Sequence, residues 1–293
     1  MPDAQGLAQS TWGWPVIVYL FLAGVGAGAC LFAWWAERRQ GPESLVTAGR
    51  RLAAPLVAAG TLLLVFDLGA GRMHPLRILG LYSHPASVMT LGTWILSIFL
   101  VLSVVDGYGP LAGLRPPRWW AGLTALFALG VALYTGVLLG VVQAIPFWNN
   151  ALLPVLFVLS AASAGMSAAS LTALLVERGR VELEGFRDLH RALLVAEAAV
   201  LALYLYFAAH GPEAARLSYR LVVAGPLAPA FWLGLVGAGL ALPALFELLA
   251  APRLWARVLT RPAWLGLEAG LVLVGGLCLR LLVVGAGVPM RLL

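Results

Sequence analysis

Eight apolar stretches, each roughly 20 residues long, follow one another along the chain and constrain its fold more than any other feature. A stretch of this length crosses the hydrocarbon core of a bilayer when it is helical. Backbone groups inside a membrane find no water, so each segment must satisfy its own hydrogen bonds, which favours helices. The stretches cover residues 14–35, 52–71, 87–108, 119–142, 152–176, 192–210, 229–249 and 263–285.

Composition agrees with this interpretation and excludes a soluble domain. Hydrophobic residues make up 61% of the chain and charged residues 11%, whereas a soluble domain carries roughly 25% charged residues. The joints between the stretches are short and rich in Pro, Gly and Arg. We therefore expect an all-α integral membrane protein with eight transmembrane helices, forming a single polytopic domain over residues 1–293. The formal charge of +6 is not a sign of nucleic-acid binding in such a protein.

The distribution of arginines predicts the orientation in the membrane. Thirteen arginines lie in the joints after the first, third, fifth and seventh stretches, and five lie on the other side. Cytoplasmic loops carry an excess of basic residues, so the richer side is expected to face the cytoplasm. Both termini and the polar joint from Asp67 to Trp94 should then face the periplasm.

Ionisable groups inside the stretches are the first candidates for function, because charges within a membrane are costly and usually functional. Asp67, Tyr134 and Arg280 are expected at a similar depth in the periplasmic half, where Asp67 and Arg280 should pair, either as a structural strut or as part of a site. Glu197 and Glu268 lie closer to the cytoplasmic ends, as partners of nearby arginines or as members of a proton route. Asp106 and Glu247 lie near helix ends and are interpreted as solvated interfacial groups.

Histidine and cysteine positions argue against a resident haem, cluster or metal ion. An iron–sulfur cluster usually takes four thiolates, and a haem between helices takes axial ligands from within the spans. The chain has two separate cysteines, Cys30 and Cys278, and none of its four histidines lies well inside an apolar stretch. We expect neither haem nor a metal site.

Several motifs, taken in order and with their spacing, resemble the NrfD/polysulfide-reductase family of membrane subunits. They are WGWPVIVYLFLAGVGAGA at 12–29, DLG at 67–69, HPASVMTLGTW at 84–94, YTGVLLG at 134–140, PFWNN at 146–150 and GGLCLRLLVVGAG at 275–287. The resemblance implies two four-helix bundles that anchor a respiratory molybdopterin oxidoreductase in the bacterial cytoplasmic (inner) membrane. It implies oxidation of menaquinol near the periplasmic face, with electrons passing to a ferredoxin-like iron–sulfur subunit and then to a molybdopterin catalytic subunit. The clusters and the molybdopterin would belong to those partners alone.

The same resemblance implies roles for individual residues. Tyr134 matches the family's tyrosine on the fourth span and would hydrogen-bond a quinone carbonyl. Asp67 matches an acidic residue that would take the quinol proton or hold Arg280. The polysulfide-reductase type places Asn and His side chains near the start of the first span. This protein has no histidine there and offers, beside Trp14, the polar side chains of Gln5, Gln9, Ser10, Thr11 and Tyr19. Either His84 from the following joint takes that role, since a histidine with a pKa of about 6.5 suits proton transfer, or the quinone is bound differently.

Two other functions fit parts of the sequence. A secondary transporter or proton-translocating protein would use Asp67, Glu197, Glu247 and Glu268 as a relay, although transporters often show inverted repeats and broken helices at the midplane, and no internal repeat is evident here. A purely structural anchor is the third possibility. Loop 146–150 and turn 82–85 have the aromatic composition of a docking surface.

Overall fold

The structure is a computed structural model that describes residues 12–67, 82, 87–178, 184–250 and 262–290. Regular structure within these residues is entirely helical, and eight helices are long and apolar enough to span a membrane. The predicted all-α fold with eight such helices is confirmed. The helices are α1 (Trp14–Arg38), α2 (Glu43–Asp67), α4 (Val88–Tyr108), η3 (Gly109–Ala112), α5 (Arg118–Gly140), α6 (Leu152–Val176), η4 (Glu184–Phe186), α7 (Arg187–His210), α8 (Glu213–Val223), η5 (Ala230–Ala241), α9 (Leu242–Ala250) and α11 (Pro262–Gly285).

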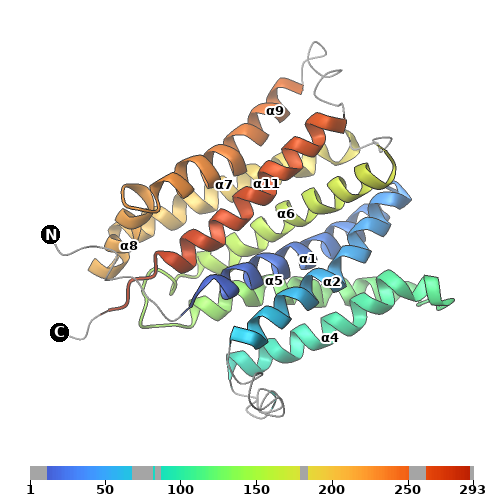
Figure 1. Cartoon of the computed structure of the whole chain (residues 1–293), viewed down its shortest axis with the longest axis horizontal. Helices are drawn as coiled ribbons and strands as arrows, with labels where there is room; N and C mark the ends of the chain where they lie inside the picture. The colour runs from blue at the N-terminus through green and yellow to red at the C-terminus, as the bar shows by residue number, and fades with distance from the viewer. Residues whose placement is uncertain (1–11, 68–81, 83–86, 179–183, 251–261, 291–293) are drawn as a thin grey trace.

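The long helices form two groups, and the largest contact between the groups is that of α1 with α6 (Figure 1). The first group contains α1, α2, α4 and α5, and the second contains α6, α7, α11 and the η5–α9 pair. We call the end at which α1 and α6 begin the outer end, and the opposite, arginine-rich end the inner end. The assignment of these ends to periplasm and cytoplasm stays a prediction from the arginine count.

Small residues bring α1 and α6 into backbone contact at the centre of the molecule. A Cβ atom added at Gly28 would fall on the carbonyl of Ala161, and one added at Gly165 would fall on the backbone of Gly28. Apolar side chains gain little by leaving lipid, so close approach of small residues is what holds membrane helices together. This crossing fixes the first group of helices against the second.

Helices extend past the apolar stretches at the inner end. Helix α2 begins at Glu43 and α7 at Arg187, both well before the predicted starts at residues 52 and 192. Arginine and glutamate are good helix formers, and a helix does not have to stop where the hydrocarbon stops. As a result, Glu197 lies near the middle of α7, where its side chain is buried.

The seventh span departs from a regular α-helix. Residues Ala230–Ala241 form a π-helix, in which the Leu242 amide donates to the carbonyl of Gly237, five residues earlier. Pro243 follows immediately and has no N–H for the carbonyl of Gly239, so α-helical hydrogen bonding is interrupted at this point. Gly239 also packs directly on Gly275 of α11.

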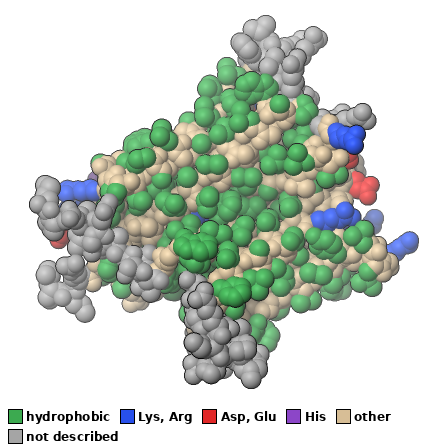
Figure 2. Space-filling model, viewed as in Figure 1, with side chains coloured by type: hydrophobic (Ala, Val, Ile, Leu, Met, Phe, Trp, Pro, Cys, Tyr) green, Lys and Arg blue, Asp and Glu red, His purple; other side chains and the backbone are tan. Residues whose placement is uncertain are grey.

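A belt of hydrophobic side chains covers the middle of the molecule, and most of the visible charged side chains lie at one end (Figure 2). This is the surface expected of a multi-pass membrane protein, in which apolar residues face lipid and charges gather near the water boundary.

Candidate functional site

Two buried tyrosines lie at matching depth in the first helix group. Tyr19 on α1 is fully buried and Tyr134 on α5 is 7% exposed. From the helix bounds, Tyr19 lies about 8 Å and Tyr134 about 9 Å from the outer ends of their helices. Both belong to the same apolar cluster and lie close enough to interact electrostatically. The two phenols therefore form a polar pair inside an otherwise apolar bundle.

The phenol of Tyr134 rests directly on a glycine of α4. A Cβ atom at Gly92 would fall on the ring and hydroxyl of Tyr134, so only glycine leaves room for this position. The hydroxyl of Tyr19 is buried and has no hydrogen-bond partner among the described residues. Buried hydroxyls are nearly always hydrogen-bonded, so an unsatisfied one marks a place where a polar ligand atom can be accepted.

The structure describes only some of the other residues that were predicted to contact the quinone. His84 lies outside the described residues, and so does the side chain of Asp67, at which α2 ends. Trp14 is 67% exposed and is five positions from Tyr19, which puts the two side chains on different sides of α1. Tyr82 is anchored by a 2.7 Å hydrogen bond between its hydroxyl and that of Ser97.

Arg280 lies deeper than the tyrosines, between α1, α6 and α11. Its Nη1 donates to the Ser160 hydroxyl and to the Gly276 carbonyl, 3.1 Å away, and its guanidinium approaches the position of Gly24. Long helical side chains point back toward the helix N-terminus, which carries this guanidinium inward from its Cα atom. The predicted common level of Tyr134 and Arg280 therefore holds for the Cα atoms but not for the charged group.

Glu197 supplies the described counter-charge for Arg280. This carboxylate, on α7, is buried and interacts with the Ser160 hydroxyl and with the guanidinium. Whether Asp67 also reaches Arg280 stays a prediction, because its side chain is not described. A buried pair bridged by a hydroxyl satisfies two charges that would each be costly alone in a membrane.

A second buried polar cluster lies toward the inner end of the same helix group. His190 Nδ1 is 3.6 Å from Glu247 Oε1 and 3.3 Å from Glu268 Oε1. Arg187 and Arg191 each direct Nε at Glu247 Oε2, at 3.0 Å and 2.8 Å. Glu247 is 3% exposed, so its interpretation as a solvated interfacial group was wrong.

The ligand atoms of His190, Glu247 and Glu268 lie within 4.8 Å of one another, as in a metal site. Two arginines already neutralise Glu247, however, so a divalent cation would add excess positive charge to a buried position. A proton shared between the histidine and the carboxylates fits the charges better. The apolar pattern had placed His190 in a joint; its spacing of seven residues from Glu197, which is two helical turns, was the available signal that both share one face.

Comparison with known sequences assigns the family. The sequence profile of the family described as "Polysulphide reductase, NrfD" matches residues 4–290. The chain belongs to the NrfD family of polysulphide reductase proteins. It is 32% identical to the C subunit of the polysulfide reductase of Wolinella succinogenes, over 94% of both proteins. It is 29% identical to the protein NrfD of Escherichia coli K12, over 80% of this protein and 84% of that one.

Among the described residues, the loop after α5 forms a packed cap at the outer end of this NrfD family member rather than an exposed aromatic loop. Trp148 is 1% exposed and its indole N–H donates to the Val283 carbonyl at 2.6 Å. The Tyr204 hydroxyl donates to the Phe147 carbonyl at 2.6 Å. Phe147 and Trp148 are therefore core residues, and the expectation that loop 146–150 presents them as a docking surface was wrong.

Proposed function

We propose that this protein is the membrane anchor and quinone-binding subunit of a respiratory oxidoreductase of the polysulfide-reductase type. It would oxidise menaquinol near the outer end and pass electrons to a periplasmic iron–sulfur subunit, which feeds a molybdopterin catalytic subunit. Membership of the NrfD family supports the assignment to such a complex. The observation that carries the quinone site is the pair of buried phenols, of which Tyr19 has an unsatisfied hydroxyl.

The chemistry of the pair suits a quinol. A tyrosine hydroxyl both donates and accepts a hydrogen bond, so Tyr134 and Tyr19 can hold either the hydroxyl oxygens of a quinol or the carbonyl oxygens of a quinone. Menaquinol supplies two electrons and two protons. Asp67 and His84, at the outer end of α2 and in the joint that follows, would take the protons toward the periplasmic side, while the apolar helix faces hold the isoprenoid tail.

The test replaces single hydroxyls in the assembled complex. Tyr134→Phe and Tyr19→Phe should each lower quinol-dependent turnover by roughly ten- to a hundred-fold, the range expected when one hydrogen bond to a group that becomes charged is lost. Turnover with an artificial dye that reduces the catalytic subunit directly should stay unchanged.

Tyr204→Phe is the matched control. Tyr204 lies on α7, in the other helix group, and is similarly buried, but its hydroxyl donates to the backbone carbonyl of Phe147. Normal quinol turnover in both site variants would refute the proposed site.

A proton route through the second helix group is the additional function that the geometry favours. His190, Glu247 and Glu268 surround the inner part of the route, and a cavity of about 40 Å³ beside them is large enough for ordered water. Glu197 lies two turns further along α7, and the Ser160–Arg280 pair follows it toward the middle of the membrane. These groups would carry protons between the cytoplasmic side and the membrane interior.

This second function is tested by measuring proton movement and electron transfer together. The complex, reconstituted into vesicles that enclose a pH-sensitive dye, is compared with its Glu197→Gln variant during quinol oxidation. Glu197→Gln should abolish the internal pH change and retain most electron transfer. Glu177→Gln, which makes the same substitution at an exposed position just after α6, should change neither. An unchanged proton signal in Glu197→Gln would exclude the route.

A further inference from the structure

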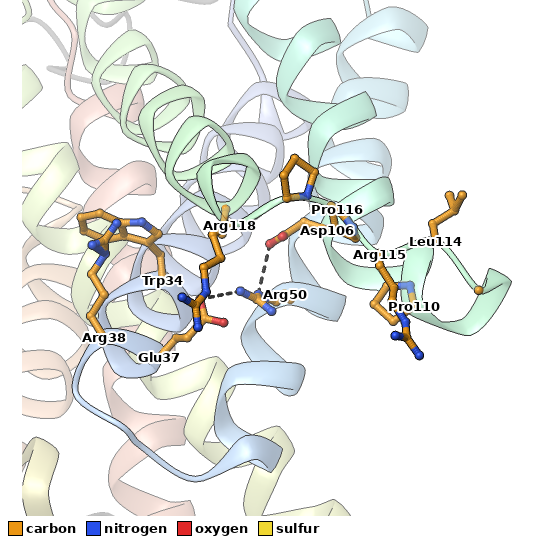
Figure 3. Close-up of a pocket in the computed structure, with 13 residues that line it drawn as sticks. Trp34, Glu37, Arg38, Arg50, Asp106, Pro110, Leu114, Arg115, Pro116 and Arg118 are labelled. Atoms are coloured by element: carbon orange, nitrogen blue, oxygen red, sulfur yellow. Dashed lines mark hydrogen bonds and ion pairs between the residues drawn. The ribbon is translucent and has the colours of Figure 1, made fainter.

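A cavity of about 740 Å³ opens at the inner end of the first helix group, far from the tyrosine pair (Figure 3). Its walls come from the end of α1, the start of α2, the end of α4 with η3, and the start of α5. The lining is rich in guanidinium groups and is joined by one indole ring. Six lining residues determine what the cavity can bind: Trp34, Arg38, Arg50, Asp106, Leu114 and Arg118.

The cavity carries excess positive charge at its mouth. The two carboxylates that line the cavity both form ion pairs with Arg50. Arg50 Nη2 lies 2.6 Å from Glu37 Oε2, and Arg50 Nε lies 3.2 Å from Asp106 Oδ2. Arg38 and Arg118 form no ion pair with any described residue. Figure 3 shows Arg118 reaching from α5 toward the Arg50–Glu37 pair, while Arg38 lies over the ring of Trp34. Two guanidinium groups are therefore free to bind an anion beside a fixed ion-pair network.

The wall of the cavity also presents a buried donor without an acceptor. The indole N–H of Trp34 is buried and makes no hydrogen bond within the described part of the protein. This nitrogen and Nη2 of Arg38 both face Gly122 of α5, at 3.7 Å and 4.0 Å from the place where a side chain at that position would begin. A neutral donor and a cationic donor therefore lie near the same part of α5, next to Ala121, which lines the cavity. Such a pair matches an anion with several acceptor oxygens.

The rim of the cavity lies at the level of the membrane surface. Arg38 ends the first helix that is long and apolar enough to span a membrane and Arg118 begins the fourth, so both guanidinium groups are expected near the hydrocarbon boundary. Leu114 on the rim is 54% exposed and Trp119, next to Arg118, is 63% exposed. Exposed leucine and tryptophan at this level are suited to acyl chains and headgroups rather than to water.

We propose that this cavity binds the phosphate group of an anionic phospholipid from the cytoplasmic leaflet. The guanidinium groups of Arg38 and Arg118 and the indole N–H of Trp34 would hold the phosphate oxygens, because planar guanidinium groups bind phosphate through two parallel hydrogen bonds. Leu114 and Trp119 would lie against the acyl chains. Basic pockets between helices on the cytoplasmic side are known to suit anionic headgroups. The bound lipid would bridge α1 and α5 at the inner end.

The experiment measures lipid binding by native mass spectrometry of the full-length protein in detergent, titrated with phosphatidylglycerol and, separately, with phosphatidylcholine. Arg38→Gln combined with Arg118→Gln should weaken phosphatidylglycerol binding by roughly thirty-fold, since each basic residue near an anionic surface contributes about one factor of five. The matched control is Arg39→Gln combined with Arg51→Gln, which removes the same charge from the same end but from positions that do not line the cavity. The control should stay within a factor of three of the unmodified protein, a bound set by the weak interaction of screened surface charges.

Two further variants separate binding from folding. Arg38→Lys combined with Arg118→Lys keeps the charge but loses the paired N–H groups, so it should bind phosphatidylglycerol more tightly than the double glutamine variant and more weakly than the unmodified protein. Trp34→Phe leaves a ring under Arg38 and removes only the N–H donor; it should weaken binding by roughly ten-fold, as expected for one hydrogen bond to a charged group. Retention of normal binding by both the double glutamine variant and Trp34→Phe would overturn the proposal.

The remaining outcomes are equally decisive. Equal loss in the cavity variant and the control variant would mean diffuse surface attraction, and equal binding of phosphatidylcholine would mean no selection for anionic lipid. Binding of inorganic phosphate together with no measurable binding of phosphatidylglycerol would identify a free phosphate site instead. Each of these three results contradicts a lipid site. A loss of phosphatidylglycerol binding that is confined to the cavity variants supports it.

Discussion

Gly92→Ala tests the quinone site through packing rather than through removal of a hydroxyl. The added methyl would fall on the ring and hydroxyl of Tyr134, and α4 and α5 pack together along this line. Alanine is favoured over glycine within a helix by about 1 kcal/mol, whereas overpacking costs about 1–3 kcal/mol. The net loss of stability is therefore about 2 kcal/mol or less, and the protein should still fold.

The effect on function should be much larger than the effect on stability. To clear an added methyl, the Tyr134 ring has to move by about 1 Å or more, and a displacement of that size costs about a hundred-fold in rate when it misplaces a reacting group. Quinol-dependent turnover of the purified complex should fall accordingly, with dye-dependent turnover retained.

Gly130→Ala provides the comparison, because a methyl there meets only Ile95 Cγ2, at 3.2 Å, in the same helix pair. That variant should keep at least about half of its quinol turnover, because a small shift of the Ile95 side chain makes room for the methyl. If Gly92→Ala turned over quinol at the normal rate, the assignment of Tyr134 to the site would be refuted.

Three further predictions concern stability. Trp148→Phe removes the indole hydrogen bond to α11 and some packing, so it should cost about 2 kcal/mol and lower the midpoint of thermal unfolding in detergent. Gly28→Ala would push α1 off the backbone of α6, at a cost of about 3 kcal/mol or more, and should abolish the yield of monodisperse protein, while Gly270→Ala, which faces open space, should not. Ser160→Ala withdraws an acceptor from buried Arg280 and should cost about 1–3 kcal/mol, measurable as a lower unfolding midpoint; an unchanged midpoint would mean that water replaces the hydroxyl.

Much of the fold could be predicted because the membrane leaves few alternatives. Eight apolar stretches in a solvent without hydrogen-bonding partners become eight helices, and the structure has them. Departures from this simple pattern of eight regular helices were harder to predict from the sequence. Helix α8 was missed because it is short and polar, although Ala214, Ser218 and Leu221 repeat at helical spacing and form its buried face. The π-helical segment depends on backbone register next to Pro243, which residue types alone do not reveal.

The sequence predicted how far along their helices the site residues lie, but not which side chains they contact. Position along a span put the Cα atoms of Tyr134 and Arg280 at one level, because helix rise is constant. It did not reveal that Arg280 reaches inward to Ser160 and Glu197, since that depends on side-chain direction and on which helices are neighbours. The cluster around His190 was missed because α7 begins before its apolar stretch, which carries His190 into the buried interior.

The cap at the outer end has a consequence for how the protein is made. The Met290 amide donates to the Ala144 carbonyl at 2.7 Å, and the Val288 amide donates to the Ser218 hydroxyl at 3.2 Å. The first contact joins the segment after α11 to the loop between α5 and α6, and the second joins it to α8; both partners are synthesised before α11. During co-translational insertion, the cap can therefore close only after the last helix has entered the bilayer. Its closure would mark completed assembly, and a ribosome-stalled or truncated polypeptide would leave the cap open at the outer end, where an unpacked loop is more easily cut by proteases.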